Sequence, residues 1–439
     1  MVASRFDVLV AGGGPAGSIA ALVLARGGAT VALVDKSTFP RDKACGDIVG
    51  PRGLEVLREL GVPSLAGHDV GDIVVVGPSG RRRVQLPCGE GLTYPGHGTA
   101  VTRASLDATL HGLAVEAGAV PVHGHIVATV TADGRVDGCR LATGSELHAD
   151  FVIGADGATS RVAGAAGMVD ATRVIWGFAV RSYLPDGVDL PAIVFWEPEP
   201  WRAFPGYGWA FPAMEGGANV GLGLGMVADR RAGAKVAPAL PRFLEHLREA
   251  GILNGASAST PPRCVGGWLK MGMVGTVPAA GPVLLVGDAA GLVNPLQGEG
   301  IAQAMGSGRA AAEAILGDPG RAAARYRAAV AAEHLPYHRI TAALQRWLVD
   351  RPRAVSSVGR LLMMAGRSDA LSGGWSIFWN ELLRGAPANR HRSVAAAATR
   401  LGDWATAHSA TARWFDDVFP AVEPTGSASL AGTVTSQRE

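Results

Sequence analysis

Residues 7–17 read Asp7-Val-Leu-Val-Ala-Gly-Gly-Gly-Pro-Ala-Gly17, and this stretch decides the fold. Apolar residues 6–10 predict a buried parallel strand, and residues 18–26 predict the helix that follows the turn. Glycine at positions 12, 14 and 17 lets the turn tighten and lets the backbone approach a pyrophosphate at the helix N-terminus. We therefore predict a dinucleotide site here, in preference to a glycine-rich turn that binds nothing.

The next predicted strand, residues 30–34, ends at Asp35, whose carboxylate can hold a pair of ribose hydroxyls. A strand, a glycine turn, a helix and an acid together are a more specific signal than the glycines alone. The expected cofactor contacts in this region are Gly12, Gly14, Pro15, Ala16, Gly17, Asp35 and Lys36. We add Val127, in the segment 120–130 that predicts a strand returning to the nucleotide fold, to the same set.

A second glycine-rich stretch, Gly287-Asp-Ala-Ala-Gly-Leu-Val-Asn-Pro-Leu-Gln-Gly-Glu-Gly300, lies far downstream. Residues 283–286 predict a short strand that delivers Asp288 at its end, where a carboxylate can accept a hydrogen bond from a ribityl hydroxyl. Gly298 and Gly300 then open a predicted helix that begins with Ile301. Its N-terminus can press against a flat ring and favours negative charge, such as that of a reduced flavin. The two stretches together predict FAD rather than NAD, in preference to a turn used only for packing.

The predicted fold class is α/β, with a Rossmann-like FAD-binding domain, an inserted substrate domain with an antiparallel sheet, and a helical C-terminal region. We predict the FAD-binding domain over 1–70, 98–170 and 275–320, and the substrate domain over 71–97 and 171–274. Short apolar and aromatic segments between residues 176 and 226, separated by Pro and Gly, predict the antiparallel sheet, to which 73–76 and 83–86 add two strands. The helical region covers 321–423, and the Ser/Thr/Gly-rich residues 424–439 predict a disordered tail.

Arginines and large apolar side chains interleave over residues 338–367. A basic amphipathic surface can lie on an anionic membrane. The interpretation that we favour is a set of surface helices whose apolar stripe faces the protein core. No uninterrupted apolar run reaches the roughly 18 residues that a spanning helix needs, so any membrane contact is expected to be peripheral.

Charge and cysteine usage exclude several classes of protein. The 439 residues carry a formal net charge of +2, so no nucleic-acid partner is expected. The four cysteines, at positions 45, 88, 139 and 264, form neither a C-x-x-C pair nor metal-ligand spacing, so no metal site is expected. The first residues show no signal-peptide pattern, and we expect a cytoplasmic protein.

Three stretches carry a resemblance to a known family: Phe39-Pro-Arg-Asp-Lys-Ala-Cys-Gly-Asp47, Tyr207-Gly-Trp-Ala-Phe-Pro212 and residues 288–305. In this order they resemble the FAD-dependent geranylgeranyl reductases, within the flavoproteins shaped like para-hydroxybenzoate hydroxylase. The resemblance spans roughly residues 5–315 and leaves out the C-terminal helices. Where many members carry Cys-Gly-Gly, this chain has a Cys-Gly-Asp form similar to that of bacterial menaquinone-type reductases, and the extra carboxylate is expected to alter the charge beside the ring.

The resemblance implies that Cys45 and Gly46 lie along the isoalloxazine with Asp47 beside them. It also implies that the guanidinium of Arg103 meets the FAD, and that the Asp156-Gly157 pair supports the cofactor or its reductant. The alternative for Cys45 is a small buried residue, and the alternative for Arg103 is a solvent-exposed side chain.

Tyr207, Trp209 and Phe211 alternate along one predicted strand, so their rings point to the same face. The resemblance places that face over the flavin, as the wall of an apolar substrate channel. Together with Cys45, these three residues are the expected catalytic set. The alternative for the three rings is an aromatic stripe that packs the sheet on the core.

The sequence contains no second G-x-G-x-x-G unit, so reducing equivalents are expected from transiently bound NAD(P)H or from a carrier protein. A reduced flavin can transfer hydride to a carbon-carbon double bond or react with oxygen. An apolar channel suits a prenyl chain. Our leading hypothesis is therefore an FAD-dependent reductase of an isoprenoid or related apolar substrate. The alternatives are a flavin monooxygenase or halogenase, whose usual Trp-x-Trp-x-Ile-Pro stretch is not found, and a non-redox flavoprotein cyclase of secondary metabolism.

Overall fold

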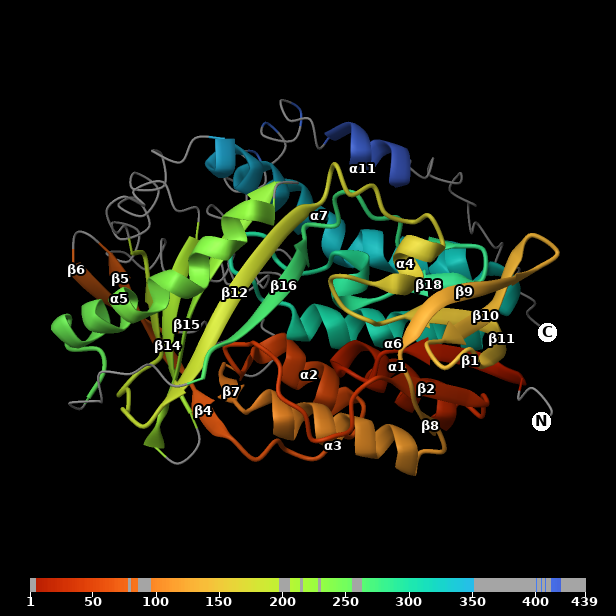
Figure 1. Cartoon of the computed structure of the whole chain (residues 1–439), viewed down its shortest axis with the longest axis horizontal. Helices are drawn as coiled ribbons and strands as arrows, with labels where there is room; N and C mark the ends of the chain where they lie inside the picture. The colour runs from red at the N-terminus through yellow and green to blue at the C-terminus, as the bar shows by residue number, and fades with distance from the viewer. Residues whose placement is uncertain are drawn as a thin grey trace, which may run out of the picture.

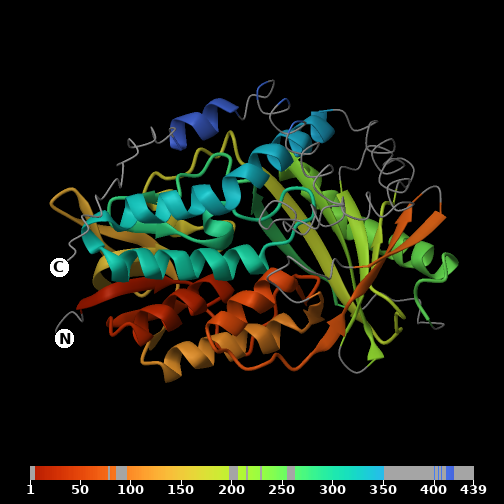
Figure 2. The same cartoon turned by 180° about the vertical axis from the view of Figure 1, so that it is seen from behind.

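The computed structural model describes residues 5–77, 80–85, 96–196, 206–213, 216–227, 230–254, 263–350, 400, 404, 407 and 412–419. Three sheets, with helices packed on their faces, make up this described part (Figure 1). The view from behind shows the long helices α6 and α7 lying side by side over the first sheet (Figure 2).

The first sheet has eight strands and carries the glycine turn. At its centre β1 (Arg5–Ala11) pairs in parallel with β2 (Val31–Asp35) and with β11 (Glu146–Gly154). The order is β17-β18-β11-β1-β2-β8, and a hairpin of β9 and β10 joins at β11. The remaining bounds are β8 (Val120–His123), β9 (Ile126–Ala132), β10 (Arg135–Leu141), β17 (Ala279–Ala280) and β18 (Val283–Leu285).

Helices bury the apolar faces of this sheet. α1 (Pro15–Arg26) packs between α3 (Arg103–Glu116) and α6 (Ile301–Gly317), and α2 (Pro51–Glu59) also contacts α6. The short α4 (Arg161–Ala165) lies against β9. The strands and helices share one continuous apolar core, so the sheet edge that follows the glycine turn is held rigidly.

The second sheet has seven strands in the order β16-β12-β15-β14-β13-β5-β6. All neighbours are antiparallel except β13 and β5. One face is covered by α5 (Val236–Glu249), whose Phe243 and Leu247 are buried against it. The strands are β5 (Asp72–Gly77), β6 (Gly80–Gln85), β12 (Ile175–Leu184), β13 (Ala192–Val194), β14 (Gly206–Pro212), β15 (Ala218–Val227) and β16 (Val265–Met271). The prediction that 73–76 and 83–86 join this sheet is confirmed for the described residues.

A small third sheet links the other two. It consists of β3 (Ile48–Val49), β7 (Gly98–Ala100) and β4 (His68–Val70), in that order. β3 begins directly after Asp47, and β7 is followed by α3, so this sheet holds together the loop before β3 and the start of α3.

One predicted strand is in fact two. Residues 120–130 divide into β8, which pairs with β2, and β9, which pairs with β10. The chain changes partner at Gly124, whose N–H donates to the carbonyl of Asp35, while the carbonyl of His125 accepts from Ala142. Both backbone groups are thus satisfied outside a continuous ladder.

After the two sheets the described chain is helical. α7 (Ala322–Asp350) contains Pro336 and packs on α6, and α11 (Ala412–Val418) lies further along the chain. Short 3-10 turns are η2 (Arg230–Lys235), η3 (Gly287–Ala290) and η4 (Pro319–Arg321). Residues 351–399 and the predicted tail 424–439 lie outside the described residues, and so does most of the arginine-rich segment. Among the described helices, none is both long and apolar enough to cross a membrane. The predicted α/β fold class is confirmed.

Candidate active site

The carboxyl ends of three parallel strands meet at one edge of the first sheet. Ala11 of β1 lies beside Gly154 of β11, and Gly154 lies beside Leu285 of β18. The glycine turn, Asp156 and Asp288 follow directly after these strand ends. The register therefore brings together three segments that are far apart in the sequence, at the edge where open α/β sheets bind their ligands.

The glycine turn is built without room for side chains. Gly12 has a φ of 106°, and a Cβ on it would collide with the carbonyl of Ala155. Gly14 is the N-cap of α1 and supplies no side-chain cap, and the first turn of α1 carries no acid. The N–H groups of this helix end are thus left for an anion from outside the turn.

Asp35 ties the turn to the next strand. Its Oδ2 accepts from the N–H of Gly13 at 2.7 Å, and its Oδ1 accepts from the N–H of Ser37 at 2.8 Å. Each oxygen keeps a further lone pair. The predicted contact with a ribose stays a prediction, as does that of the exposed Lys36 that follows.

Asp156 caps a helix. Its Oδ2 accepts from the N–H of Arg161 at 2.6 Å and from that of Val162 at 3.2 Å, at the start of α4. Gly157 beside it has a φ of 83°, a conformation that favours glycine. The pair holds the chain in a sharp turn after β11, and a contact of Asp156 with the cofactor or its reductant stays a prediction.

Asp288 lies at the rim of a cavity, in the turn η3 after β18. Its carboxylate and that of Asp156 both lie in electrostatic range of the buried ammonium of Lys270, on β16. Burial lowers the pKa of Lys270 to about 8, although the two carboxylates oppose this shift. The sequence reasoning did not single out Lys270, which lies near Asp288 but does not line the cavity, because an isolated lysine in a short strand gives no signal of its own.

The segment Cys45-Gly46-Asp47 forms one wall of the cavity. Asp47 has a φ of 63° and is only 3% exposed. Its carboxylate accepts from the N–H of Arg103 at 3.2 Å and from the hydroxyl of Tyr183. Burial raises the pKa of Asp47, while the hydrogen bonds from Tyr183 and Asn219 favour its charged form.

Asn219, on β15, connects this segment to the second sheet. Its Nδ2 lies 2.8 Å from the Asp47 carboxylate and 2.8 Å from the carbonyl oxygen of Cys45, and its Oδ1 accepts from the indole N–H of Trp209 at 2.9 Å. Every polar atom of this fully buried amide is thus engaged. Sequence reasoning missed Asn219, although a single amide within an apolar strand was a usable signal.

Arg103 is buried, which contradicts the solvent-exposed alternative. Its guanidinium donates to both oxygens of Asp107, at 2.8 and 2.7 Å, and Arg41 also pairs with that carboxylate at 2.9 Å. The fork of Arg103 is therefore fixed in orientation, and it lies beside the thiol of Cys45. Burial raises the pKa of Cys45, and the charge of Arg103 opposes this rise.

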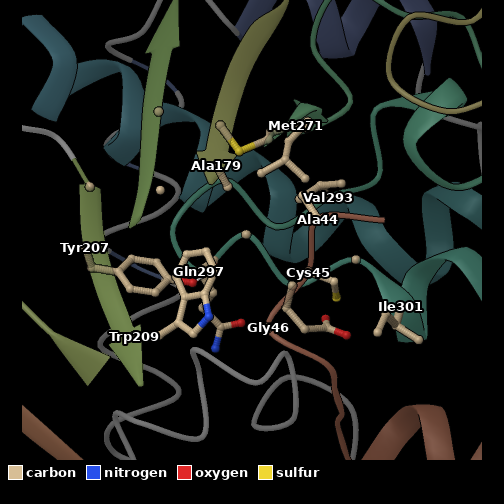
Figure 3. A pocket seen from close by; sticks show the side chains of 18 of the residues that line it. Ala44, Cys45, Gly46, Ala179, Tyr207, Trp209, Met271, Val293, Gln297 and Ile301 are labelled. Atoms are coloured by element: carbon tan, nitrogen blue, oxygen red, sulfur yellow. Dashed lines mark hydrogen bonds between the residues drawn. The ribbon is translucent and has the colours of Figure 1, made fainter. Parts of the chain in front are cut away.

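The aromatic rings of Tyr207, Trp209 and Phe211 also line the cavity, and Figure 3 shows the first two of them. On β14, Trp209 stacks on Phe211 with ring centroids 6.4 Å apart, and Tyr207 lies 6.3 Å from Trp209. The hydroxyl of Tyr207 donates to the carbonyl of Gln297. The alternate residue Gly208 faces away, where a Cβ would collide with Phe243 under α5. Glycine at 208 thus lets α5 approach the covered face and leaves the rings on the cavity side.

The cavity has a volume of about 230 Å³ and lies between the two sheets. The lining comes from the segment 43–48, from β12, β14 and β16, and from residues 293–301 before and at the start of α6. Of the predicted residues, it brings together Pro15, Cys45, Gly46, Asp47, Arg103, Tyr207, Trp209, Phe211, Asp288, Gly298, Gly300 and Ile301. Val127 is not among them: it lies on β9 and is 42% exposed, so its predicted cofactor contact has no support from the cavity.

These residues fit a dinucleotide that ends in a flat ring. Both α1 and α6 begin at a glycine whose own position supplies no side-chain cap, and at α6 the side chain of Glu299 accepts from one backbone N–H, that of Ala302. Gly46 packs closely on the ring of Phe211, since a Cβ on it would lie 2.8 Å from that ring. A cavity lined by small residues and by aromatic rings suits a flat ring such as that of FAD, and fold and site together define a flavoprotein oxidoreductase.

Comparison with known proteins gives the same class. Residues 5–316 match the FAD binding domain family. A menaquinone reductase from Mycolicibacterium smegmatis is 35% identical over 324 residues, which cover 71% of this chain and 76% of that protein. Digeranylgeranylglycerophospholipid reductase 2 from Methanopyrus kandleri is 34% identical over 325 residues, which cover 70% of this chain and 76% of that protein.

A solved structure shares the fold. The geranylgeranyl bacteriochlorophyll reductase-like protein from Thermoplasma acidophilum superposes with a TM-score of 0.70 at 23% identity, over 90% of this chain and 99% of that one. The chain belongs to the FAD-dependent geranylgeranyl reductase family, and its cofactor is FAD.

Proposed function

We propose that this flavoenzyme saturates carbon-carbon double bonds in the prenyl chain of an isoprenoid substrate, such as a menaquinone or a geranylgeranyl lipid. The observation that carries the proposal is the cavity lined by the aromatic rings of Tyr207, Trp209 and Phe211, which lie beside the Cys45-Gly46-Asp47 segment. The names of the relatives, a menaquinone reductase and a digeranylgeranylglycerophospholipid reductase, support the same substrate class.

FAD would be held by the glycine turn at its pyrophosphate, by Asp35 at a ribose and by Asp288 at the ribityl chain, with Cys45, Gly46 and Gly300 along the ring. When reduced, the bound flavin supplies a hydride. The remaining tasks fall to the side chains of this chain. The three rings exclude water and hold a prenyl segment flat, since an apolar chain offers no polar group by which to orient it.

Asp47 takes part by positioning rather than by proton transfer. Its carboxylate is saturated with donors from Arg103, Tyr183 and Asn219. It thereby fixes the turn that carries Cys45 and joins it to the strand behind Trp209. We infer that the extra carboxylate in the Cys-Gly-Asp segment serves to hold this segment in place beside the aromatic rings of β14.

The test uses dithionite as the reductant, so that no physiological donor is needed. Purified protein with FAD is incubated anaerobically with menaquinone-4 or geranylgeraniol in detergent, and the products are exposed to air and weighed by mass spectrometry. Air reoxidises a quinone ring but leaves a saturated chain unchanged, so a persistent gain of two hydrogen atoms supports the proposal. A gain of one oxygen under aerobic turnover would instead favour the monooxygenase, and an isomer of unchanged mass would favour the cyclase.

The physiological reductant and the place of action are separate proposals. We infer that NAD(P)H binds transiently or that a carrier protein delivers the electrons. We also infer peripheral contact with a membrane, because a prenyl substrate partitions into lipid. Stopped-flow reduction by NADPH and by NADH tests the first inference, and co-sedimentation with anionic vesicles tests the second.

A further inference from the structure

A stripe of buried polar side chains runs along one face of α7 and has no part in the chemistry described so far. His334, His338, Thr341 and Gln345 follow helical spacing, and none is more than 4% exposed. Gln345 lines the cavity, whereas the side chain of Glu333, at the other end, is 28% exposed. The stripe thus runs from near the protein surface to the substrate cavity.

Glu299 also lines the cavity. Its Oε1 accepts from the N–H of Ala302 at 3.1 Å, at the start of α6, and Gln303 and Arg52 lie beside the same carboxyl. A cap needs only an acceptor oxygen, which a glutamine supplies as well. Burial raises the pKa of Glu299, while the Ala302 N–H, Gln303 and Arg52 oppose this rise.

His338 is a buried imidazole, a group that can both accept and donate a proton. Among the described residues, neither of its ring nitrogens has a hydrogen-bond partner. Its ring lies 5.9 Å from that of His334 and 6.0 Å from that of Tyr337. Burial lowers the pKa of His338 well below its ordinary value, and His334 and Arg52 add to this effect. A buried neutral imidazole of this kind suits a bridging water, through which it accepts on one nitrogen and donates from the other.

Arg52 ties the stripe to Glu299. Its guanidinium pairs with Glu333 and lies in electrostatic range of both Glu299 and His338. The Nε2 of His334 is 4.0 Å from the Glu333 carboxylate. Glu333, His334, His338 and Glu299 are therefore titratable groups gathered around one arginine, between the outside and the cavity.

We propose that Glu299 is the acid that protonates the substrate, and that the α7 stripe returns the proton to it. This inference rests on the proposed function. The π bond of the alkene breaks: one carbon takes the hydride, with its two electrons, from the reduced flavin, and the other takes the carboxyl proton of Glu299. The carboxylate that remains accepts a proton passed along His338 and His334 from solvent at Glu333, so no further reactant is required.

Other acids of the cavity are less suited to this step. Burial raises the pKa of both Tyr207 and Cys45, which moves a phenol and a thiol further from neutrality and makes them weaker acids. The hydroxyl of Tyr207 already donates to Gln297, and Asp47 accepts from three donors. For a carboxyl, which is ordinarily ionised at neutral pH, the same burial favours the step. It raises the pKa of Glu299 toward neutrality, so that the group can hold a proton and then donate it.

The test compares Glu299→Gln with Glu313→Gln, since Glu313 is an exposed glutamate on α6 that pairs with Arg309. Glu299→Gln keeps the oxygen that caps Ala302, so both variants should bind FAD and be reduced by dithionite as the wild type is. Chain saturation of menaquinone-4 or geranylgeraniol, measured by mass spectrometry, should fall about 100-fold or more in Glu299→Gln and stay unchanged in Glu313→Gln. A Glu299→Gln rate within about twofold of the wild type overturns the proposal.

Two further measurements separate this inference from the proposed function. Infrared difference spectra in H₂O and D₂O should show a protonated carboxyl band at neutral pH that Glu299→Gln lacks, and an ionised Glu299 overturns the inference whether or not a prenyl probe is reduced. His338→Gln should bind FAD normally yet show a slower, more deuterium-sensitive turnover, and an unchanged solvent isotope effect would remove the stripe from the path. If the wild type saturates neither probe, the proposed function fails, and the infrared result still decides the protonation of Glu299.

Discussion

The amide nitrogen of Asn219 lies 2.8 Å from the carboxylate of Asp47, and this contact joins the second sheet to the loop that carries Cys45. The same amide holds the indole of Trp209 at 2.9 Å. One side chain, which does not itself line the cavity, therefore positions both the Cys45 loop and the ring of Trp209.

We expect Asn219→Ala to lower the free energy of unfolding by about 1–3 kcal/mol, because it leaves buried partners without a hydrogen bond. Denaturant unfolding measures this loss, and the amount of retained FAD reports on the Cys45 loop. Asn254→Ala is the matched control, since its amide bonds Asp189 at 2.7 Å at an exposed site. Equal losses of unfolding free energy in the two variants would mean that the contact of Asn219 with Asp47 stabilises the protein no more than an exposed hydrogen bond does.

Asp288→Ala should bind FAD about 10- to 100-fold more weakly, since it removes a charged acceptor from the end of β18. Flavin absorbance of the purified protein and a fluorescence titration measure the change. Asp189→Ala is the control: it removes an exposed carboxylate that does not line the cavity, and this variant should retain FAD fully. A fully yellow Asp288→Ala protein would contradict the assigned role.

Trp209→Ala should retain FAD while turnover falls by about 100-fold, because a prenyl chain that is no longer held flat is displaced from the reacting position. Steady-state kinetics with a polyprenyl probe gives this number. Trp196→Ala serves as the control, because Trp196 packs on Phe243, 5.2 Å away, under the covered face of the sheet. If the kinetics of Trp209→Ala are unchanged, the ring only packs the sheet.

Lys270 gives a pH dependence of stability with a defined sign. Its pKa is about 8 in the folded protein against 10.5 ordinarily, so between these values the unfolded chain binds the extra proton and stability rises with pH. The melting temperature of FAD-free wild type should therefore increase relative to Lys270→Met from about pH 8 to 10.5, and the gap should be constant below pH 8. A gap that stays flat across the whole range would show that the ammonium is solvated.

Much of the site could be predicted from local pattern. The glycine turn and Asp35 follow from the spacing in a single βαβ unit, and the shared face of Tyr207, Trp209 and Phe211 follows from the two-residue period of a strand. Family resemblance added Cys45 and Arg103. These features need no knowledge of which strands are neighbours.

The remaining residues depend on tertiary register. Asn219 becomes a partner of Asp47 only because β15 lies behind the loop after β2. Lys270 comes into electrostatic range of Asp288 only because β16 lies near η3, after the end of β18. The pattern of polar residues on α7 is visible in the sequence, but its burial against α6 is not. Val127 lies outside the cavity and is 42% exposed, so its contact with the cofactor stays a prediction.

The order of strands in the first sheet also bears on how a newly made chain acquires its flavin. β11 stands between β1 and β18, so the glycine turn is synthesised first, yet the sheet edge beside it is complete only when β18 and α6 have left the ribosome. Pairings between such distant segments form slowly. Until then β11 has an open edge that is free to pair elsewhere, and the chain lacks Asp288, so the FAD site is complete only late in synthesis.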